Sequence, residues 1–165
     1  MTSTVNIRTG ISADIPFIQG VAVGTWPATY GKILKEDQLD YMLGLFYSES
    51  ALQEQMNNGH TFLIAEAGDN AIGFASFNLI DTAVYKLQKL YLLPVAQGTG
   101  AGKLLLNEVI ERIKAKGCKK LHLNVNRYNN AKGFYEKMGF AVISEEDIAI
   151  GNGYFMNDFV MELPL

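Results

Sequence analysis

The spacing of hydrophobic and polar residues along the chain changes about 60 residues from the N-terminus. Before that point apolar residues recur every three or four positions, as Ile15, Ile18 and Ala22 do, and this is the spacing of one helix face. Ser12 is a good N-cap for this first helix, and Pro27 is expected to end it. Two further helical patterns follow, so the first third of the chain is predicted to be mostly helical.

After that point, residues typical of strands dominate. Residues 61–67, 71–80 and 84–93 are predicted to form an antiparallel meander, because short turn sequences separate them. The other predicted elements are an opening strand over 5–8, a helix over 104–116, a strand over 119–125, a short helix over 131–138, and strands over 140–150 and 154–163. The order β-α-α-α-β-β-β-α-β-α-β-β indicates an α/β fold with a mixed, twisted sheet of about seven strands and helices on both faces.

Composition limits the class of protein. The 165 residues fit a single domain over 1–165, and a net charge of −3 offers no basic surface for nucleic acid. The one cysteine, Cys118, excludes an internal disulfide and a zinc cluster, so we expect no metal and a reducing, cytoplasmic location. No signal-like start and no long uncharged apolar run is present, so no membrane partner is expected.

The most informative stretch lies between the strand over 84–93 and the helix over 104–116. It is a loop with glycine at positions 98, 100 and 102, followed by Lys103. Free N–H groups at a helix start, together with the helix dipole, favour an anion such as a phosphate. The loop lacks the Gly-Lys-Ser/Thr ending of nucleotide-hydrolysing P-loops and does not fit the dinucleotide fingerprint. The alternative interpretation is a glycine turn without a ligand.

A second motif, over residues 129–140, reads Asn-Asn-Ala-Lys-Gly-Phe-Tyr-Glu-Lys-Met-Gly-Phe. Together with Gln-Gly-Thr-Gly-Ala-Gly over 97–102, it resembles the two hallmarks of the GCN5-related N-acetyltransferase (GNAT) superfamily, in the family's order. The resemblance covers about residues 5–163. It implies an N-acetyltransferase that uses acetyl-CoA as cosubstrate and transfers the acetyl group to a primary amine.

The resemblance also implies roles for particular residues. Tyr135 corresponds to the general acid that protonates the leaving thiolate, although helical spacing alone would also make it a core residue. The usual glutamate base is replaced by Asn124, which leaves Asp81, Glu66, His122 and His60 as candidates. The implied acetyl-CoA contacts are Leu90, Tyr91 and Leu92 for the pantetheine arm, Gln97, Gly98, Thr99, Gly100, Ala101, Gly102 and Lys103 for the pyrophosphate, and Asn129 or Asn130 on the other side of the arm.

The acceptor is less well determined by the sequence. Trp26 and Tyr30 are expected to form walls of its pocket, with Asp81 as a further substrate contact. The pattern around Trp26, with Asp158 and Met161 near the end, resembles bacterial polyamine N-acetyltransferases, so we expect a small cationic amine. The alternatives are a peptide or protein α-amine, and a regulatory module that binds acyl-CoA without turnover. A homodimer is also expected, because exposed sheet edges often pair.

Overall fold

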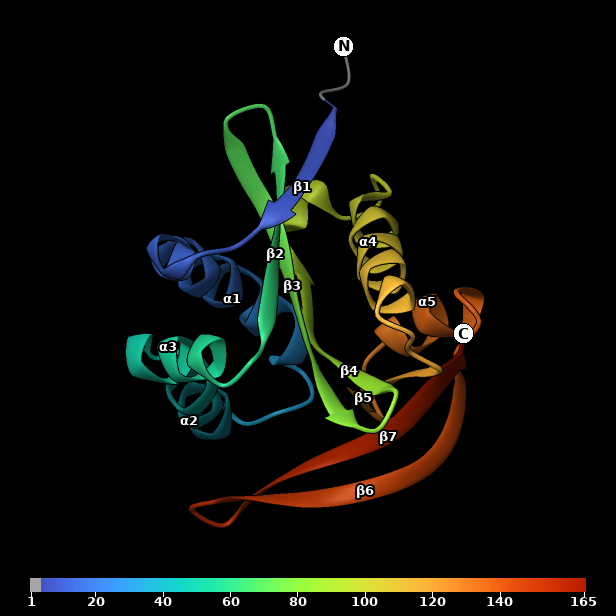
Figure 1. Ribbon diagram of the computed structural model, residues 1–165. Helices are drawn as coiled ribbons and strands as arrows, with labels where there is room; N and C mark the ends of the chain where they lie inside the picture. The colour runs from blue at the N-terminus through green and yellow to red at the C-terminus, as the bar shows by residue number, and fades with distance from the viewer. Residues whose placement is uncertain (1–3) are drawn as a thin grey trace.

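The computed structural model describes residues 4–165. Seven strands and five α-helices form one mixed sheet with helices on both faces (Figure 1). Their bounds are β1 Val5–Thr9, α1 Ile15–Tyr30, α2 Glu36–Tyr47, α3 Glu49–Asn57, β2 Thr61–Ala67, β3 Asn70–Asp81, β4 Val84–Leu92, α4 Ala101–Ala115, β5 Lys120–Asn126, α5 Ala131–Lys137, β6 Ala141–Gly151 and β7 Tyr154–Pro164. The predicted order of elements and the fold class are confirmed.

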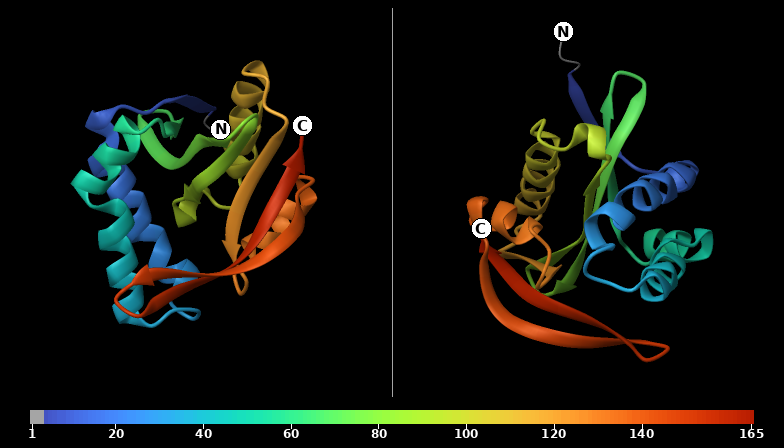
Figure 2. Two further views of the ribbon diagram at one scale, coloured as in Figure 1. Left: turned by 60° about the horizontal axis from the view of Figure 1, so that its bottom comes forward. Right: turned by 180° about the vertical axis from the view of Figure 1, so that it is seen from behind.

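The strand order in the sheet is β1-β2-β3-β4-β5-β7-β6. Tight hairpins join β2, β3 and β4, so these strands run antiparallel and form the predicted meander. The chain crosses from β4 to β5 through α4, and this connection makes β4 and β5 the one parallel pair among the described strands. The long β6–β7 hairpin completes the sheet and curves toward α2 (Figures 1 and 2).

Two hydrophobic cores hold the helices to the sheet. Helices α1, α2 and α3 cover one face, where Ile18 and Leu52 pack with Phe62 and Phe74. Helices α4 and α5 cover the other face, where Leu106 packs in the core that also holds Leu121. The alternation of β5 follows from this arrangement, because Leu121, Leu123 and Val125 are buried toward α4 and α5 while the residues between them are only partly buried.

The sheet is open at its centre. Strands β4 and β5 are paired only from Val84–Lys120 to Leu87–Leu123, and beyond that point they diverge. The register between β3 and β4 shifts between Ser76 and Phe77, which leaves Gln88 as an extra residue in β4. Such a bulge bends its strand and increases the local twist. The bulge at Gln88 lies near the middle of β4.

Two details of the N-terminal region differ from the prediction. Pro27 does not end α1, which continues to Tyr30. Proline removes a hydrogen bond to the carbonyl four residues earlier, but that residue, Val23, is 62% exposed, so water can satisfy its carbonyl. Burial of Trp26 and Tyr30 on either side of Pro27 stabilises the last turn in spite of the proline.

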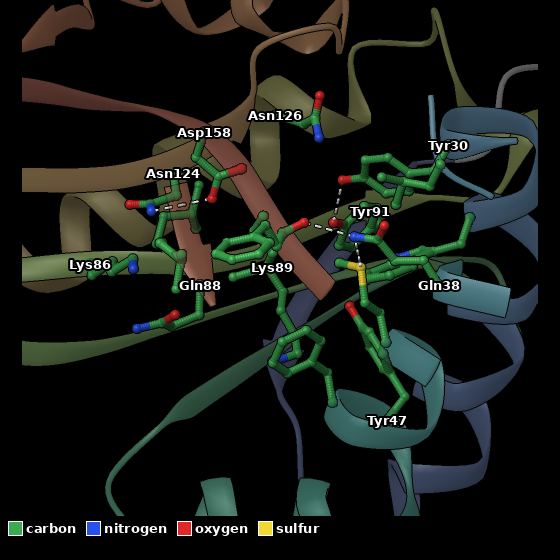
Figure 3. A pocket seen from close by; sticks show the side chains of 18 residues that line it. Tyr30, Gln38, Tyr47, Lys86, Gln88, Lys89, Tyr91, Asn124, Asn126 and Asp158 are labelled. Carbon is green, nitrogen blue, oxygen red and sulfur yellow. Dashed lines mark hydrogen bonds between the residues drawn. The ribbon is translucent and has the colours of Figure 1, made fainter. Parts of the chain in front are cut away.

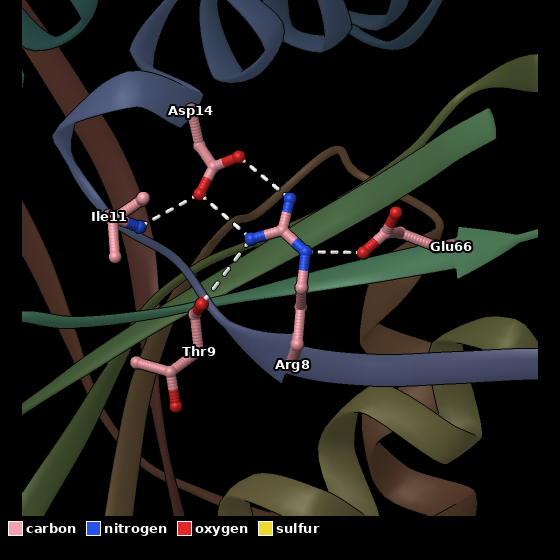
Figure 4. A network of polar contacts seen from close by, with 5 residues as sticks. All are labelled: Arg8, Thr9, Ile11, Asp14 and Glu66. Carbon is pink, nitrogen blue, oxygen red and sulfur yellow. Dashed lines mark hydrogen bonds and ion pairs between the residues drawn. The ribbon is translucent and has the colours of Figure 1, made fainter. Parts of the chain in front are cut away.

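Ser12 does not cap the first helix. It lies inside a short 3₁₀ turn, and the carboxylate of Asp14 accepts the Ile11 N–H at 2.8 Å instead. The same carboxylate binds the Arg8 guanidinium, which also pairs with Glu66 of β2 (Figure 4). Hydrogen bonding to Arg8 lowers the pKa of Asp14 below its usual value. This network fixes the entry of the chain into α1 and has no connection to the open centre of the sheet.

Candidate active site

The gap between β4 and β5 exposes backbone groups of β4. The N–H of Leu93 donates to the Ile72 carbonyl at 2.8 Å, so that group faces β3. Because backbone groups alternate sides along a strand, the N–H groups of Leu90 and Leu92 face the gap, whereas that of Tyr91 faces β3. Of the three residues predicted for the arm, Leu90 and Leu92 therefore offer free backbone N–H groups, and Tyr91 offers its side chain; the Leu92 carbonyl accepts from the Gln97 side chain at 3.3 Å.

The glycine loop ends directly in α4. Gly98 and Gly100 have φ of 76° and 86°, which favour glycine, and α4 begins at Ala101, three residues earlier than predicted. No side chain caps this helix start, and the N–H groups of residues 101–103 donate to no other residue among 4–165. The Thr99 hydroxyl donates to the Ala96 carbonyl and so holds the loop in place. The result is a cluster of outward N–H groups at the positive end of a helix dipole.

A cleft of about 930 Å³ runs from this loop along the gap. That volume lies within the range of sites for large cofactors and ligands. Most of the residues predicted to contact acetyl-CoA line it, whereas Thr99 and Ala101 do not, because Ala101 is fully buried and the Thr99 hydroxyl is bound to the loop. The predicted residues that line the cleft are Leu90, Tyr91, Leu92, Gln97, Gly98, Gly100, Gly102, Lys103, Asn129, Asn130 and Tyr135.

Helix α5 carries Tyr135, and the turn before it carries Asn129 and Asn130; all three line the cleft. Tyr135 is 8% exposed, and its ring packs against Phe134 and Phe140. Burial, and to a lesser extent the nearby Tyr30, raises the pKa of Tyr135 above that of an ordinary phenol, so the hydroxyl keeps its proton at neutral pH. The Asn129 side-chain oxygen accepts the Ala131 N–H at 2.9 Å in the turn that leads into α5, which leaves its amide nitrogen for other contacts.

A second, smaller cavity of about 170 Å³ lies on the side of the sheet covered by α1 and α2 (Figure 3). Both predicted walls, Trp26 and Tyr30, line it. Phe155 and Met156 of the β6–β7 hairpin close its far side. The two cavities share Tyr30, Leu87, Gln88, Lys89, Tyr91 and Asn124, so they meet at the bulge of β4.

Charged groups stand inside the small cavity. Among the described residues that line it, Asp158 of β7 is the one carboxylate; it is 6% exposed and accepts from the Asn124 amide at 3.3 Å. Burial raises the pKa of Asp158, against the lowering effects of Asn124 and Lys86. Lys86 and Lys89 of β4 line the same cavity. Burial lowers the pKa of both ammonium groups, that of Lys89 to about 8.

The four residues that the sequence suggested as a base lie elsewhere. Asp81 ends β3, and its carboxylate accepts the Thr82 N–H at 2.7 Å in the turn to β4. Glu66 pairs with Arg8, and His122 pairs with Glu162 at 2.8 Å. None of the four, His60 included, is among the described residues that line either cavity. The structure thus does not bring the predicted substrate contact Asp81 to the acceptor pocket.

Asp158 and Lys89 are functional candidates that the sequence argument did not identify as such. Asp158 is part of a weak family pattern in the sequence, but β7 also holds Glu162, so no local signal separates the two carboxylates. Lys89 is likewise one of two lysines in β4, and the sequence does not distinguish it from Lys86. Among residues 4–165 no group of three or more histidine, cysteine or acidic side chains could hold a metal ion, and no helix is long and apolar enough to cross a membrane.

Free N–H groups along a splayed strand, a glycine-rich helix start at one end and a protonated phenol at the other together define an acyl-CoA-dependent transferase. The comparison with known families agrees. The model of the GNAT acetyltransferase domain matches residues 34–163, and the chain belongs to this family. It is an N-acetyltransferase whose cosubstrate is acetyl-CoA.

Relatives extend over nearly the whole chain. The crystal structure of PaiA N-acetyltransferase from Thermoplasma acidophilum in complex with coenzyme A has a TM-score of 0.83 and 31% identity, and the match covers 98% of this chain and 99% of that one. An uncharacterised N-acetyltransferase of Mycobacterium bovis is 27% identical over 150 residues, 90% of this chain and 96% of that protein. The [ribosomal protein bS18]-alanine N-acetyltransferase of Haemophilus influenzae is 40% identical over 87 residues, 51% of this chain and 58% of that protein.

Proposed function

We propose that this N-acetyltransferase transfers the acetyl group to the primary amine of a small acceptor held in the cavity between α1, α2 and the β6–β7 hairpin. The observation that carries the proposal is the meeting of the two cavities at Gln88 and Asn124. A thioester entering from the large cleft and an amine entering from the small cavity therefore reach the same point. Such convergence is what direct transfer between two bound substrates requires.

On the donor side, backbone groups do most of the binding. The N–H groups of residues 98–103 and the dipole of α4 hold the diphosphate. Leu90 and Leu92 pair with the pantetheine arm as a neighbouring strand would, because their N–H groups face the gap. The Leu90 N–H, the free donor of the arm nearest the junction at Gln88, donates to the thioester carbonyl, where negative charge develops during attack. Acetyl-CoA, when bound, supplies the activated acetyl group.

Two side chains serve as the general base and the general acid of the reaction. Asp158 accepts the proton of the acceptor ammonium, directly or through one water, and its raised pKa makes it a better base than an exposed aspartate. Asn124 holds this carboxylate at the junction of the two cavities. Tyr135 donates its proton to the leaving thiolate, because burial keeps the phenol protonated. Asp158 thus takes the role for which the sequence showed no glutamate.

The charge balance of the small cavity bears on the acceptor. A carboxylate at Asp158 supports an acceptor with a cationic amine, as the sequence suggested. Lys86 and Lys89 line the same cavity, so an acceptor with several positive charges, such as a polyamine, would meet repulsion there. We therefore propose a small acceptor with one cationic amine in preference to a polyamine. A volume of about 170 Å³ supports a small molecule.

Acetylation of a peptide α-amine is the second candidate, supported by the partial match to the enzyme that acts on the alanine of ribosomal protein bS18. A peptide needs an open groove beside the reacting amine. Here Gln38 of α2 donates to the Phe155 carbonyl and Tyr41 donates to the Ile150 carbonyl, both at 2.7 Å. These bonds join α2 to the β6–β7 hairpin over the cavity, which supports a small acceptor.

The test is release of free thiol from acetyl-CoA with a panel of amines and short peptides. Tyr135→Phe should retain coenzyme A binding and lose about 10²- to 10⁴-fold in kcat with the best amine. Tyr85→Phe is the matched control, because Tyr85 lies in β4 but lines neither cavity. Turnover of peptides alone would favour the second candidate, and coenzyme A binding without any turnover would favour a regulatory module. The homodimer, the cytoplasmic location and the single domain remain predictions from the sequence.

A further inference from the structure

Hydrogen-bond donors without partners gather at one end of the small cavity. The indole N–H of Trp26 and the hydroxyl of Tyr47 are both buried and make no hydrogen bond within the described chain. The residues are 4% and 5% exposed, and both line the cavity. Their rings meet edge to face at 5.4 Å. Buried polar groups are rarely left unsatisfied, so these two point to a ligand.

The ammonium of Lys89 lies at the same end. Its Nζ is 5.4 Å from the centroid of the Tyr47 ring and donates to the Gln55 side-chain oxygen at 2.8 Å. No carboxylate among residues 4–165 forms an ion pair with it. Burial lowers the pKa of Lys89 to about 8, which still leaves most of the group charged at pH 7. A buried cation without an anion is costly, and an anionic ligand would offset that cost.

The opposite end of the cavity holds a carboxylate. Asp158 and Asn124 lie there, on the other side of the cavity from Tyr47 (Figure 3). The cavity therefore has a carboxylate at the end where the amine reacts and three donors at the other end. An ammonium donates only and an indole N–H donates only, so the second end is suited to an oxyanion.

We propose that the acceptor is zwitterionic: it is a small amino acid or a close relative whose carboxylate is bound by Lys89, Trp26 and Tyr47 while its amine lies beside Asp158. This inference rests on the proposed function, because it names the substrate class of the same site. The carboxylate satisfies the two orphaned donors and neutralises the buried lysine. Neither a simple alkylamine nor a polyamine carries a group that can do so.

The experiment compares acceptors that differ by one carboxylate. The pairs are lysine with cadaverine, ornithine with putrescine, and 6-aminohexanoate with pentylamine, each assayed for kcat/KM with acetyl-CoA. Loss of a charge-assisted hydrogen bond at a buried site corresponds to about 10- to 100-fold. The carboxylate-bearing member of at least one pair should be preferred by that factor. Equal rates, or a preference for the member without a carboxylate, would overturn the inference and leave the proposed acetyltransferase function intact.

Variants separate recognition from folding. Lys89→Met should remove the preference for the carboxylate, measured as the ratio of kcat/KM within each pair of acceptors. Tyr47→Phe, which keeps the ring and deletes the hydroxyl, should reduce the preference in part. Lys116→Met is the control, because this lysine is exposed at the end of α4. A preference that survives in Lys89→Met would contradict the assignment. If no acceptor of either kind is acetylated although coenzyme A binds, the proposed function itself fails.

Discussion

Lys89 offers a sharp test, because its proposed role in binding has a cost in stability. The Lys89 side chain extends from β4 and lines the small cavity. It makes one hydrogen bond, to Gln55, and no ion pair among the described residues. Replacing it by methionine keeps a long, apolar side chain and removes the charge. We predict that Lys89→Met is more stable than the natural protein at pH 7, although it loses recognition of the acceptor. Residues that serve function often destabilise the fold in this way.

The size of the stability gain expected for Lys89→Met follows from the lowered pKa of Lys89. Burial lowers the pKa of Lys89 from 10.5 to about 8, a difference of 2.5, and each pKa unit is worth about 1.36 kcal/mol. The charged lysine therefore costs the fold about 3 kcal/mol at most, and loss of the Gln55 hydrogen bond lowers the expected gain to about 1–3 kcal/mol. Between pH 8 and 10.5 the unfolded chain binds more protons than the folded one, so the natural protein gains stability as pH rises. The destabilisation by the charged lysine is at its full size below pH 8 and disappears above pH 10.5.

Urea unfolding followed by the fluorescence of Trp26, the single tryptophan, measures this difference. The stability advantage of Lys89→Met should be largest at pH 7 and fall by more than half at pH 9.5. Lys116→Met, which removes an exposed charge, should show no such dependence. A variant that is less stable than the natural protein at pH 7, or a gain that does not change with pH, would refute the idea that Lys89 is a buried, unpaired cation.

Three other predictions follow from the structure. Gly100→Ala, at φ 86°, should cost about 1 kcal/mol and lower the Tm by about 2–4 °C, and a thermal shift assay should also find weaker coenzyme A binding. Tyr41→Phe removes the bond to Ile150, so steady-state kinetics should show a higher KM for the acceptor with kcat nearly unchanged. Arg8→Met removes the group that lowers the pKa of Asp14. The stability this pair adds is present above the ordinary pKa of an aspartate and is lost as pH falls through the lowered pKa of Asp14, so urea midpoints of variant and natural protein should differ at pH 7 and converge only in strong acid.

Local sequence was enough to predict the glycine loop and the helix that follows it. Gly98 and Gly100 have positive φ, and the loop leads directly into α4, so the geometry of this helix start follows from about ten neighbouring residues. The same holds for β5, whose alternation predicts which side chains are buried. Element order then followed from turns and periodicity.

The acceptor side could not be predicted in the same way. The small cavity brings together Lys89 of β4, Tyr47 of α2 and Asp158 of β7, and only the tertiary packing makes them neighbours. The bulge at Gln88 depends on the register between β3 and β4, which no local pattern specifies. Pro27 shows a related limit: its effect on α1 depends on whether Val23 is exposed, and exposure is a property of the fold.

The most direct test of the central claim is a crystal structure of the protein with coenzyme A. The account predicts the diphosphate on the N–H groups of residues 98–103, and the pantetheine arm beside β4 with hydrogen bonds to Leu90 and Leu92. The thiol should then lie at the junction near Gln88, within reach of Tyr135. A diphosphate bound elsewhere, or an arm that leaves the gap between β4 and β5 empty, would contradict the account.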